Sequence, residues 1–393
     1  MDSNSCQSII IGLDFGTTYS GIAWALKDSE NLVEVVSTWP DGGNRTSPKV
    51  PTTISYDNQK FSWGFQTTHS EDVIRGIKLL LDPDQETNYN PFLNAKKLLK
   101  SLDKTPSDVT ADYLKELVDH AKDILKRRFG PAANHMDRVF VLTIPAVWSD
   151  KAKDVTLKAA HSAGIPPSKL TMLSEPESAA LYALRSITEY YQGKTLNSND
   201  DVIVVCDAGG GTVDLISYAV ESLSPLSLKE IVEGTGGLCG SMILDERFEN
   251  FLEDLIGPKR FKKLSKRTKD SAHRYWQEVV KPNFVGKSDD DFDACERAVP
   301  LPGAKNDTSI GLEAGFLLMN ESQIQGIFYP VVQDVLALVR GQIKNIQATY
   351  LSVKAIVLVG GFGGSEYLYR RLRPENPKLT VMQPPNAWQA IVQ

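Results

Sequence analysis

The chain contains 393 residues, of which 41% are hydrophobic and 23% are charged. These proportions are ordinary for a folded globular protein and argue against long disorder, collagen-like repeats and disulfide scaffolds. The 43 basic and 49 acidic residues leave a formal net charge of −6, so no overall positive field attracts nucleic acid or an anionic membrane surface. A chain of this length is expected to fold as two or three domains.

The cysteines and the N-terminal residues indicate the cellular setting. None of the four cysteines forms a C-x-x-C pair, which argues against a zinc site and against a thioredoxin-like motif. The first residues lack the basic and apolar regions of a signal peptide, and no apolar run approaches the ~20 residues of a membrane span. We therefore expect a cytoplasmic monomer with no nucleic-acid or membrane partner.

The N-terminal segment is predicted to form a β-hairpin. An apolar run over residues 8–13 is followed by the turn Asp14-Phe15-Gly16-Thr17-Thr18, and a second apolar run covers residues 19–26. Two strands around a short glycine-containing turn are typical of a hairpin. An Asp-x-Gly-x-Thr sequence is therefore expected at the hairpin tip.

Strands and helices alternate through the middle of the chain. The spacing of apolar residues predicts a helix over residues 110–129, and an apolar run at 138–144 predicts a buried strand that ends at Pro145. Further helices are expected over residues 151–163 and 178–187. This alternation predicts an α/β fold with mixed β-sheets.

The hairpin pattern returns in the second half of the chain. An apolar strand over residues 202–206 precedes the turn Asp207-Ala208-Gly209-Gly210-Gly211-Thr212, and a further strand is expected over residues 213–220. The aspartates Asp14 and Asp207 lie 193 residues apart, about half the chain. Each half is therefore predicted to be one copy of an ancestral unit.

We predict two lobes that meet at a polar segment near residue 195. Residues 1–195 are assigned to lobe I and residues 196–393 to lobe II. Each lobe is expected to carry one insertion, the loop-rich stretch 38–108 in lobe I and the highly charged stretch 246–310 in lobe II. The two hairpin turns are expected to face each other across a cleft.

The repeated turns suit a polyphosphate and its metal. Glycine turns expose successive backbone N–H groups and let them approach phosphate oxygens closely, and threonine hydroxyls add further donors. The aspartate of each turn supplies hard oxygen for Mg²⁺, which keeps most of its waters. A single short motif is more often an ordinary turn, but two copies half a chain apart favour a clamp on one metal–polyphosphate.

A third glycine-rich element lies near the C-terminus. A long helix over residues 323–347 and a buried strand over 355–359 are followed by Gly360-Gly361, with another helix beginning near Ser365. A strand that ends in Gly-Gly before a helix lets a flat ligand lie against the backbone. An ordinary strand–helix turn of small residues is an equally good interpretation of this element alone.

The sequences IGLDFGTTYS, GNRTSP, TIPAVW, SEPESAA, DAGGGTVDL and IVLVGGFGGSEYL follow one another along the chain. In this order they resemble the ATPase domain of the seventy-kilodalton heat-shock chaperones, within the actin/hexokinase-type ATPase superfamily. The matches include both phosphate motifs, the first connecting motif and the adenosine motif, and run from about residue 9 to the C-terminus. The resemblance implies an actin-like fold of two lobes with a duplicated core, in a divergent, heat-shock-seventy-like branch.

The resemblance also implies Mg²⁺ and ATP or ADP as ligands, with phosphoryl transfer to water. Asp14 and Asp207 would hold the hydration shell of Mg²⁺. Glu175 would orient a metal-bound water, and Lys78 would help to position the attacking water. The implied catalytic set is Asp14, Lys78, Glu175, Asp207 and Thr212. The implied nucleotide contacts are Gly16, Thr17, Thr18, Tyr19, Gly209, Gly210, Gly211, Asp214, Gly236, Gly237, Glu278, Lys281, Gly360, Gly361, Phe362 and Asn386.

The positions implied for base recognition depart from the family pattern. Phe362 and Gly364 stand where the family has a serine and an adenine-stacking arginine, and Asn386 replaces an aspartate. Pro282 follows Lys281 where the family has another arginine. The ring of Phe362 offers a different stacking face, worth ~1 kcal/mol for a good aromatic contact. We therefore expect intact phosphate handling and altered base recognition.

Three functions of this fold are consistent with the sequence. The first is a nucleotide switch that hydrolyses ATP slowly and couples lobe closure to a partner, with co-chaperones or client proteins as candidates. The second is a catalytically inactive scaffold, which the altered base positions favour and the retained carboxylates and Lys78 disfavour. The third is a small-molecule kinase, against which the family-like Glu175-Pro176 segment argues.

Overall fold

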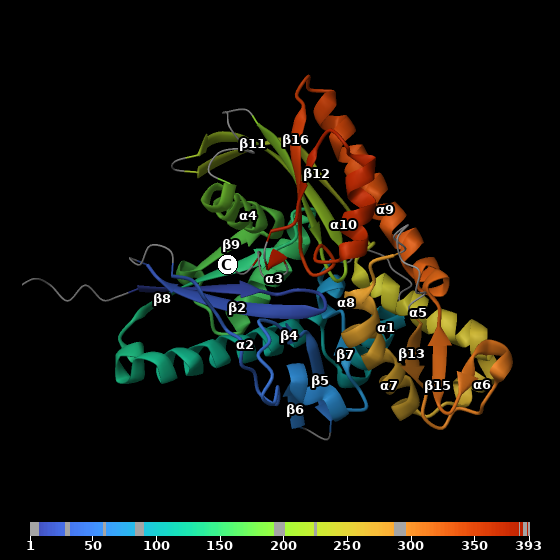
Figure 1. Cartoon of the computed structure of the whole chain (residues 1–393). Helices are drawn as coiled ribbons and strands as arrows, with labels where there is room; N and C mark the ends of the chain where they lie inside the picture. The colour runs from blue at the N-terminus through green and yellow to red at the C-terminus, as the bar shows by residue number, and fades with distance from the viewer. Residues whose placement is uncertain are drawn as a thin grey trace, which may run out of the picture.

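A computed structural model of the chain describes nearly all of the predicted elements (Figure 1). The described residues are 8–27, 32–57, 60–82, 90–191, 201–223, 226–286, 296–384, 386–387 and 391. The lobe boundary predicted at residues 195 and 196 lies outside them, as do Cys6 and Cys295. The two main sheets lie one above the other in Figure 1, and a separate group formed by α5–α7, β13 and β15 lies to the right.

The first main sheet is built from N-terminal strands. Its strand order is β3-β2-β1-β8-β9, and β4 also pairs with β2. The central strand β1 runs antiparallel to β2 and parallel to β8, so the sheet is mixed. The strands are β1 (Ser8–Asp14), β2 (Tyr19–Leu26), β3 (Glu34–Val35), β4 (Val50–Pro51), β8 (Asp137–Ile144) and β9 (Leu170–Ser174).

The second main sheet repeats this arrangement. Its order is β12-β11-β10-β16-β17, with β10 antiparallel to β11 and parallel to β16. Every residue of β10 is buried, and alternate side chains enter two different apolar clusters, as expected for a central strand covered on both faces. The strands are β10 (Val202–Ala208), β11 (Val213–Leu223), β12 (Leu226–Gly237), β16 (Val353–Val359) and β17 (Thr380–Met382). The predicted α/β fold with mixed sheets is confirmed.

The helices cover the sheets and connect them. The longest is α9, which begins at a capping box formed by Asn320 and Gln323. Helix α4 follows β9 directly, and its small residues Ala179, Ala180 and Ala183 pack against the second sheet. The helices are α1 (Asn90–Leu102), α2 (Pro106–Phe129), α3 (Asp150–Ser162), α4 (Glu175–Tyr191), α5 (Ser241–Ile256), α9 (Glu321–Gln347) and α10 (Glu366–Glu375). Sequence patterns located α2, α3, α4, α9 and the start of α10 to within a few residues, whereas α1 and α5 were not predicted.

The stretch predicted as the lobe I insertion forms a small subdomain. A three-stranded sheet of order β6-β5-β7 is joined by two 3₁₀ turns and by α1. The strands are β5 (Thr53–Asp57), β6 (Lys60–Trp63) and β7 (Ile74–Arg75), and the turns are η1 (Gly64–His69) and η2 (Ile77–Leu81). The apolar side chains of Leu79 and Phe92 pack with Met242 of α5, so this subdomain contacts the second half of the chain.

The stretch predicted as the lobe II insertion is helical and ends in a second small sheet. The basic run forms α6 (Pro258–Lys263) and the start of α7 (Lys266–Tyr275), whereas the acidic run 289–293 lies outside the described residues. After α7 come a π-helical turn (Trp276–Val280) and the short α8 (Lys281–Asn283). Because Pro282 has no N–H to donate to Glu278, the regular hydrogen-bond ladder is interrupted here. The sheet has the order β13-β15-β14, with β13 (Arg297–Pro300), β14 (Leu312–Glu313) and β15 (Phe316–Met319).

Candidate functional site

The two glycine loops of the repeated hairpins are in direct contact. A Cβ atom placed on Gly210 would lie 2.1 Å from Oγ1 of Thr18, and one on Gly211 would lie 2.8 Å from Oγ1 of Thr17. Only glycine permits so close an approach of backbone to a neighbouring side chain. The structure therefore brings the two motifs together, although they belong to different sheets.

Each loop has its own internal support. In the first loop, a Cβ on Gly16 would lie 2.1 Å from the carbonyl oxygen of Tyr19, so the turn itself requires glycine. In the second loop, the N–H groups of Ser241 and Met242 donate to the carbonyls of Gly209 and Gly210 at 3.1 and 2.8 Å. These two hydrogen bonds connect the second loop to the start of α5.

Asp14 and Asp207 occupy equivalent places in the two sheets. Each lies at or near the end of a central strand and is 2% exposed. Oδ2 of Asp14 accepts a hydrogen bond from Nζ of Lys49 at 2.6 Å, and Oδ1 lies 3.5 Å from the Thr143 hydroxyl. Oδ1 of Asp207 has no hydrogen-bond partner in the described part of the chain. The two aspartates therefore occupy equivalent strand positions but differ in their hydrogen-bond partners.

A buried ion pair joins the 3₁₀ turn η2 to the start of α4. Nζ of Lys78 donates to Oε1 of Glu175, and both side chains are less than 10% exposed. The turn begins at Gly76, whose φ of 67° is a conformation that favours glycine. The ammonium of Lys78 also lies 5.6 Å from the ring centre of Trp148. The family resemblance implied both Lys78 and Glu175 as site residues, but it did not predict that they contact each other.

Asp214 is a fourth buried carboxylate near the glycine loops, with Asp14, Glu175 and Asp207. Its Oδ2 accepts a hydrogen bond from the Thr212 hydroxyl at 2.7 Å, while Oδ1 has no partner in the residues that the structure describes. A Cβ on Gly236 would lie 3.0 Å from this Oδ1, so β12 approaches it closely. Two neighbouring carboxylate oxygens are thus buried without a donor.

Burial and neighbouring charges raise the pKa values of Glu175, Asp207 and Asp214. Burial, then the charges of Glu175, Asp214 and Asp14, holds the pKa of Asp207 well above its usual range. Burial, then the charge of Glu175, raises the pKa of Asp214 to about 7, although Thr212 acts in the opposite direction. Burial also raises the pKa of Glu175, against the effect of Lys78. Without further positive charge, not all of these groups are stable as anions at once.

Lys49 is a site residue that the sequence analysis missed. It lies directly after the GNRTSP motif, is 8% exposed and carries the ion pair to Asp14. A lysine between that motif and the apolar run from Val50 was the available signal. We call the six buried charged residues around the two glycine loops the carboxylate–lysine centre. Its members are Asp14, Lys49, Lys78, Glu175, Asp207 and Asp214.

The carboxylate oxygens of the centre suit a hydrated hard cation. The oxygens without donors, Oδ1 of Asp207 and Oδ1 of Asp214, are of the type that Mg²⁺ prefers. Within the described residues, no three His, Cys, Asp or Glu side chains are grouped to ligate a metal directly. Contact through water is the mode that Mg²⁺ commonly uses, because it gives up its hydration shell reluctantly.

The glycine-rich element after β16 contacts the second loop. Gly360 has a φ of 86°, and a Cβ there would lie 2.3 Å from Oδ1 of Asp207. Nothing lies within 4 Å of a Cβ placed on Gly361. The side chain of Phe362, by contrast, is 3% exposed and belongs to the apolar core of the second half. Its ring therefore has little free surface on which a base could stack.

The other positions implied for base recognition have protein partners. Lys281 pairs with Asp245 at 2.8 Å, and Glu278 pairs with Arg45 at 3.4 Å across the two halves of the chain. Asn386 lies beside the Gly360 turn, since the N–H of Gly360 donates to the carbonyl of the next residue, Ala387, at 3.1 Å. Gly237 closes β12, and a Cβ there would lie 3.2 Å from Leu338. We call Glu278, Lys281, Phe362 and Asn386 the base-side residues.

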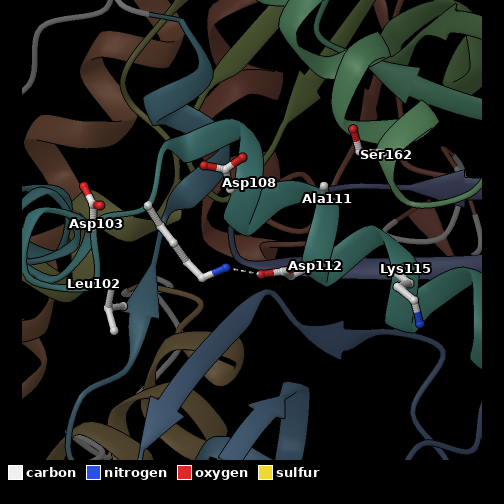
Figure 2. A pocket seen from close by; sticks show the side chains of 8 residues that line it. Leu102, Asp103, Asp108, Ala111, Asp112, Lys115 and Ser162 are labelled. Carbon is white, nitrogen blue, oxygen red and sulfur yellow. Dashed lines mark hydrogen bonds and ion pairs between the residues drawn. The ribbon is translucent and has the colours of Figure 1, made fainter. Parts of the chain in front are cut away.

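A separate hollow of about 520 Å³ lies at the N-terminal end of α2 (Figure 2). Its walls include Lys104, Asp108, Asp112 and Lys115, and Lys104 pairs with Asp112 at 2.9 Å. The residues that line it include none from the glycine loops or from the carboxylate–lysine centre. Its charged groups are largely paired, and nothing in it points to a ligand.

Comparison with known proteins identifies what the chain is similar to. The family model for the Hsp70 protein matches residues 10–222, more than half of the chain. Heat shock 70 kDa protein 12A of Homo sapiens is 26% identical over 325 residues, which cover 65% of this chain and 47% of the relative. Heat shock 70 kDa protein 12B of Homo sapiens is 24% identical over 445 residues, covering 92% of this chain and 64% of the relative.

The chain therefore spans about half to two thirds of the length of these curated relatives. Heat shock 70 kDa protein 12A of Mus musculus gives a similar result, with 26% identity over 63% of this chain. In the described ranges, no helix combines the length and apolar character needed to cross a membrane.

Proposed function

This chain belongs to the Hsp70 protein family, and we propose that it binds Mg²⁺–ATP or Mg²⁺–ADP between its two glycine loops and hydrolyses ATP slowly. The observation that supports this proposal best is the carboxylate–lysine centre beside those loops. Its buried oxygens on Asp207 and Asp214 have no donors in the described part of the chain. A hydrated divalent cation would satisfy them, and its charge would offset their mutual repulsion.

Each group has a role that follows from its position. Backbone N–H groups of the glycine loops, with the Thr17, Thr18 and Thr212 hydroxyls, would bind phosphate oxygens. Asp14 and Asp207 would bind waters of the cation, which when bound neutralises charge on the transferred phosphoryl group. The ion pair with Glu175 holds the Lys78 ammonium in one place, where it would orient an attacking water. Phosphoryl transfer needs this positioning and neutralisation more than covalent chemistry.

The switch is proposed to act through the contact between the two halves of the chain. Thr17 and Thr18 from one half touch Gly210 and Gly211 from the other, so a bound polyphosphate would alter how closely the halves approach. A protein partner whose binding depends on this approach would distinguish the nucleotide-bound state from the nucleotide-free state. The buried free thiols of Cys206 and Cys239 are compatible with a reducing, cytoplasmic setting for this monomeric switch.

Calorimetric titration and phosphate release test this proposal together. We expect Mg²⁺–ATP and Mg²⁺–ADP to bind the wild type, with slow phosphate release from ATP. Lys78→Ala should lower the release rate at least tenfold, because positioned proton and water handling contributes about 10²–10⁴-fold. Lys158→Ala is the matched control, since this lysine is exposed and pairs only within its own helix at 2.6 Å. No nucleotide binding by the wild type would overturn the proposal.

A second candidate is a nucleotide-holding scaffold without turnover. It is favoured by the base-side residues, since Phe362 is buried in the core and Lys281 is already paired with Asp245. Tight binding without phosphate release from either the wild type or Lys78→Ala would select the scaffold. A rate of release that Lys78→Ala leaves unchanged would reject the role given to Lys78.

A further inference from the structure

The ion pair between Lys49 and Asp14 is unusual for its place in the molecule. The two side chains are 10% and 2% exposed, and Nζ lies 2.6 Å from Oδ2. Burying two charges costs much of the Coulombic energy that their contact returns, so such a pair is weak evidence for stability alone. The equivalent strand position in the second sheet, Asp207, has no such ammonium and keeps an oxygen without a donor in the described residues. The asymmetry therefore requires a reason other than folding.

Lys49 is held firmly against the first glycine loop. The residue following it, Val50, begins β4 and pairs with Ser20 of β2. Thr52 donates its N–H to the Thr18 carbonyl at 2.8 Å and its hydroxyl to the Gly16 carbonyl at 2.8 Å. On the other side, the Ser47 hydroxyl donates to the carbonyl of Lys49 itself at 2.6 Å. The backbone on both sides is thus fixed, and the ammonium is directed at Asp14 by the fold.

The charges of the carboxylate–lysine centre add up in a simple way. Within the centre, four buried carboxylates face two buried ammonium groups. Lys78 pairs with Glu175 and Lys49 with Asp14. In the described residues neither ammonium forms an ion pair with Asp207 or Asp214, although the charge of Lys49 acts to lower the pKa of Asp207 and that of Lys78 the pKa of Asp214. The combined charge of these two aspartates, when both are ionised, equals that of one divalent ion. Without Lys49, Asp14 would become a further anionic position close to the same loops.

We propose that Lys49 is the fixed cation of Asp14, whose ammonium neutralises this carboxylate and limits the centre to one divalent ion held from the side of Asp207. The inference rests on the proposed function, because it concerns the cation that accompanies the nucleotide. Lys49 is a positioning residue in this arrangement and sets the number of metal ions rather than contacting the phosphate. The ion that the centre accepts would then be held mainly from Asp207 and Asp214, while Asp14, paired with Lys49, would reach it only through water.

Manganese titration separates this role from a purely structural one. Free Mn²⁺, followed by its electron paramagnetic resonance signal, is titrated with wild type, Lys49→Met and Lys49→Arg, each with and without ADP. We expect one Mn²⁺ per wild-type chain. Lys49→Met should bind a second Mn²⁺, or bind the first about tenfold more tightly, because an unneutralised carboxylate attracts the ion. Lys49→Arg keeps the charge and should restore the wild-type stoichiometry.

Removal of Lys49 leaves Asp14 buried without a partner, so folding has to be controlled. The double variant Lys49→Met with Asp14→Asn removes both charges and should regain most of the thermal stability while binding a single Mn²⁺. Identical Mn²⁺ stoichiometry and affinity in the wild type and Lys49→Met would overturn the inference. So would weaker ADP binding by Lys49→Met in metal-free buffer with unchanged Mn²⁺ binding, since Lys49 would then be a phosphate ligand.

The same titration distinguishes failure of the inference from failure of the proposed function. Mn²⁺ binding by Lys49→Met but not by the wild type would overturn both the inferred limit of one ion and the magnesium role proposed for the wild type. Absence of Mn²⁺ binding by both proteins would overturn the inference and that magnesium role together. Nucleotide binding by the wild type, measured calorimetrically in the same buffers, decides the proposed function independently.

Discussion

The carboxylate–lysine centre and the base-side residues lie in the same molecule but are built in opposite ways. All six members of the centre are less than 10% exposed, and its lysines are within hydrogen-bond distance of carboxylates. On the base side, Glu278 and its partner Arg45 are 50% and 71% exposed in their side chains, and Phe362 has turned into the core. The centre is a buried network of charge, whereas among the described base-side residues only Lys281 pairs with a buried carboxylate, that of Asp245.

The difference shows where the sequence was free to change. A buried charge without a partner is costly, so each member of the centre constrains the others. An exposed ion pair contributes little, so either partner can be replaced without harm to the fold. The two Asp-x-Gly turns resemble the phosphate motifs of the family, whereas Phe362, Gly364 and Asn386 depart from the residues expected at its base-recognition positions. The predictions below test this contrast, in order of decreasing effect.

The strongest test breaks the ion pair of Lys78. Lys78→Met leaves Glu175 buried without its cation, and we expect the free energy of unfolding to fall by about 3–5 kcal/mol. Urea denaturation near pH 7.5 measures the change. Lys78→Met combined with Glu175→Gln removes both charges and should recover most of the loss. A loss below about 1 kcal/mol for the single variant would mean that the centre is not a coupled network.

The pH dependence of stability tests the unpartnered carboxylates. The pKa of Asp214 is raised from 3.8 to about 7 in the folded state, so folding binds a proton between these values. Asp214 therefore contributes fully to the free energy of unfolding below about pH 4. This contribution, at most roughly 4 kcal/mol, is lost as the pH rises through about 7.

Scanning calorimetry of the metal-free protein between pH 5 and 8 should therefore show a falling melting temperature. Asp214→Asn should flatten this profile, and Mg²⁺ should raise the melting temperature most at pH 8, where the carboxyl is ionised. The exposed Asp254 supplies the control, and Asp254→Asn should leave the profile as it is. A wild-type melting temperature that rises toward pH 8 would contradict the assignment.

The variant Gly210→Ala, which adds one methyl group, tests the contact between the glycine loops. Gly210→Ala would place Cβ 2.1 Å from the Thr18 hydroxyl oxygen, so one loop has to move. We expect stability to fall by about 1–3 kcal/mol and nucleotide affinity to fall about tenfold, measured by calorimetry. Gly341→Ala is the control, because a Cβ there meets nothing within 4 Å. Wild-type affinity in Gly210→Ala would show that the loops need not touch.

The smallest effect is expected on the base side. Arg45→Ala removes an exposed pair whose atoms are 3.4 Å apart, and stability should change by less than ~0.5 kcal/mol. Added salt should reduce even this difference, since it screens exposed charges. Urea denaturation at low and high ionic strength provides the measurement. A change as large as that of Lys78→Met would remove the distinction between the two regions.

The main elements of the fold were accessible from the sequence because they are local. Alternating and continuous apolar runs marked β1, β8, β10 and β16, and helical spacing marked α2 and α9 with end errors of a few residues. The hairpin turns were found because glycine and aspartate between two apolar runs are typical turn residues. The position of α4 was less accessible, since its alanines suit either sheet and only the structure shows them against the second.

The site residues divide along the same line. The sequence by itself determined which groups we propose for the metal–phosphate site, because Asp14, Asp207 and their glycines occur in short motifs whose chemistry is local. Only the tertiary structure decided that Lys49 neutralises Asp14 and that the ring of Phe362 is buried in the core. The physical reason is that neither a contact across 35 positions of chain nor the direction of one ring is encoded in neighbouring residues. Both arise from packing and from the pairing of buried charge.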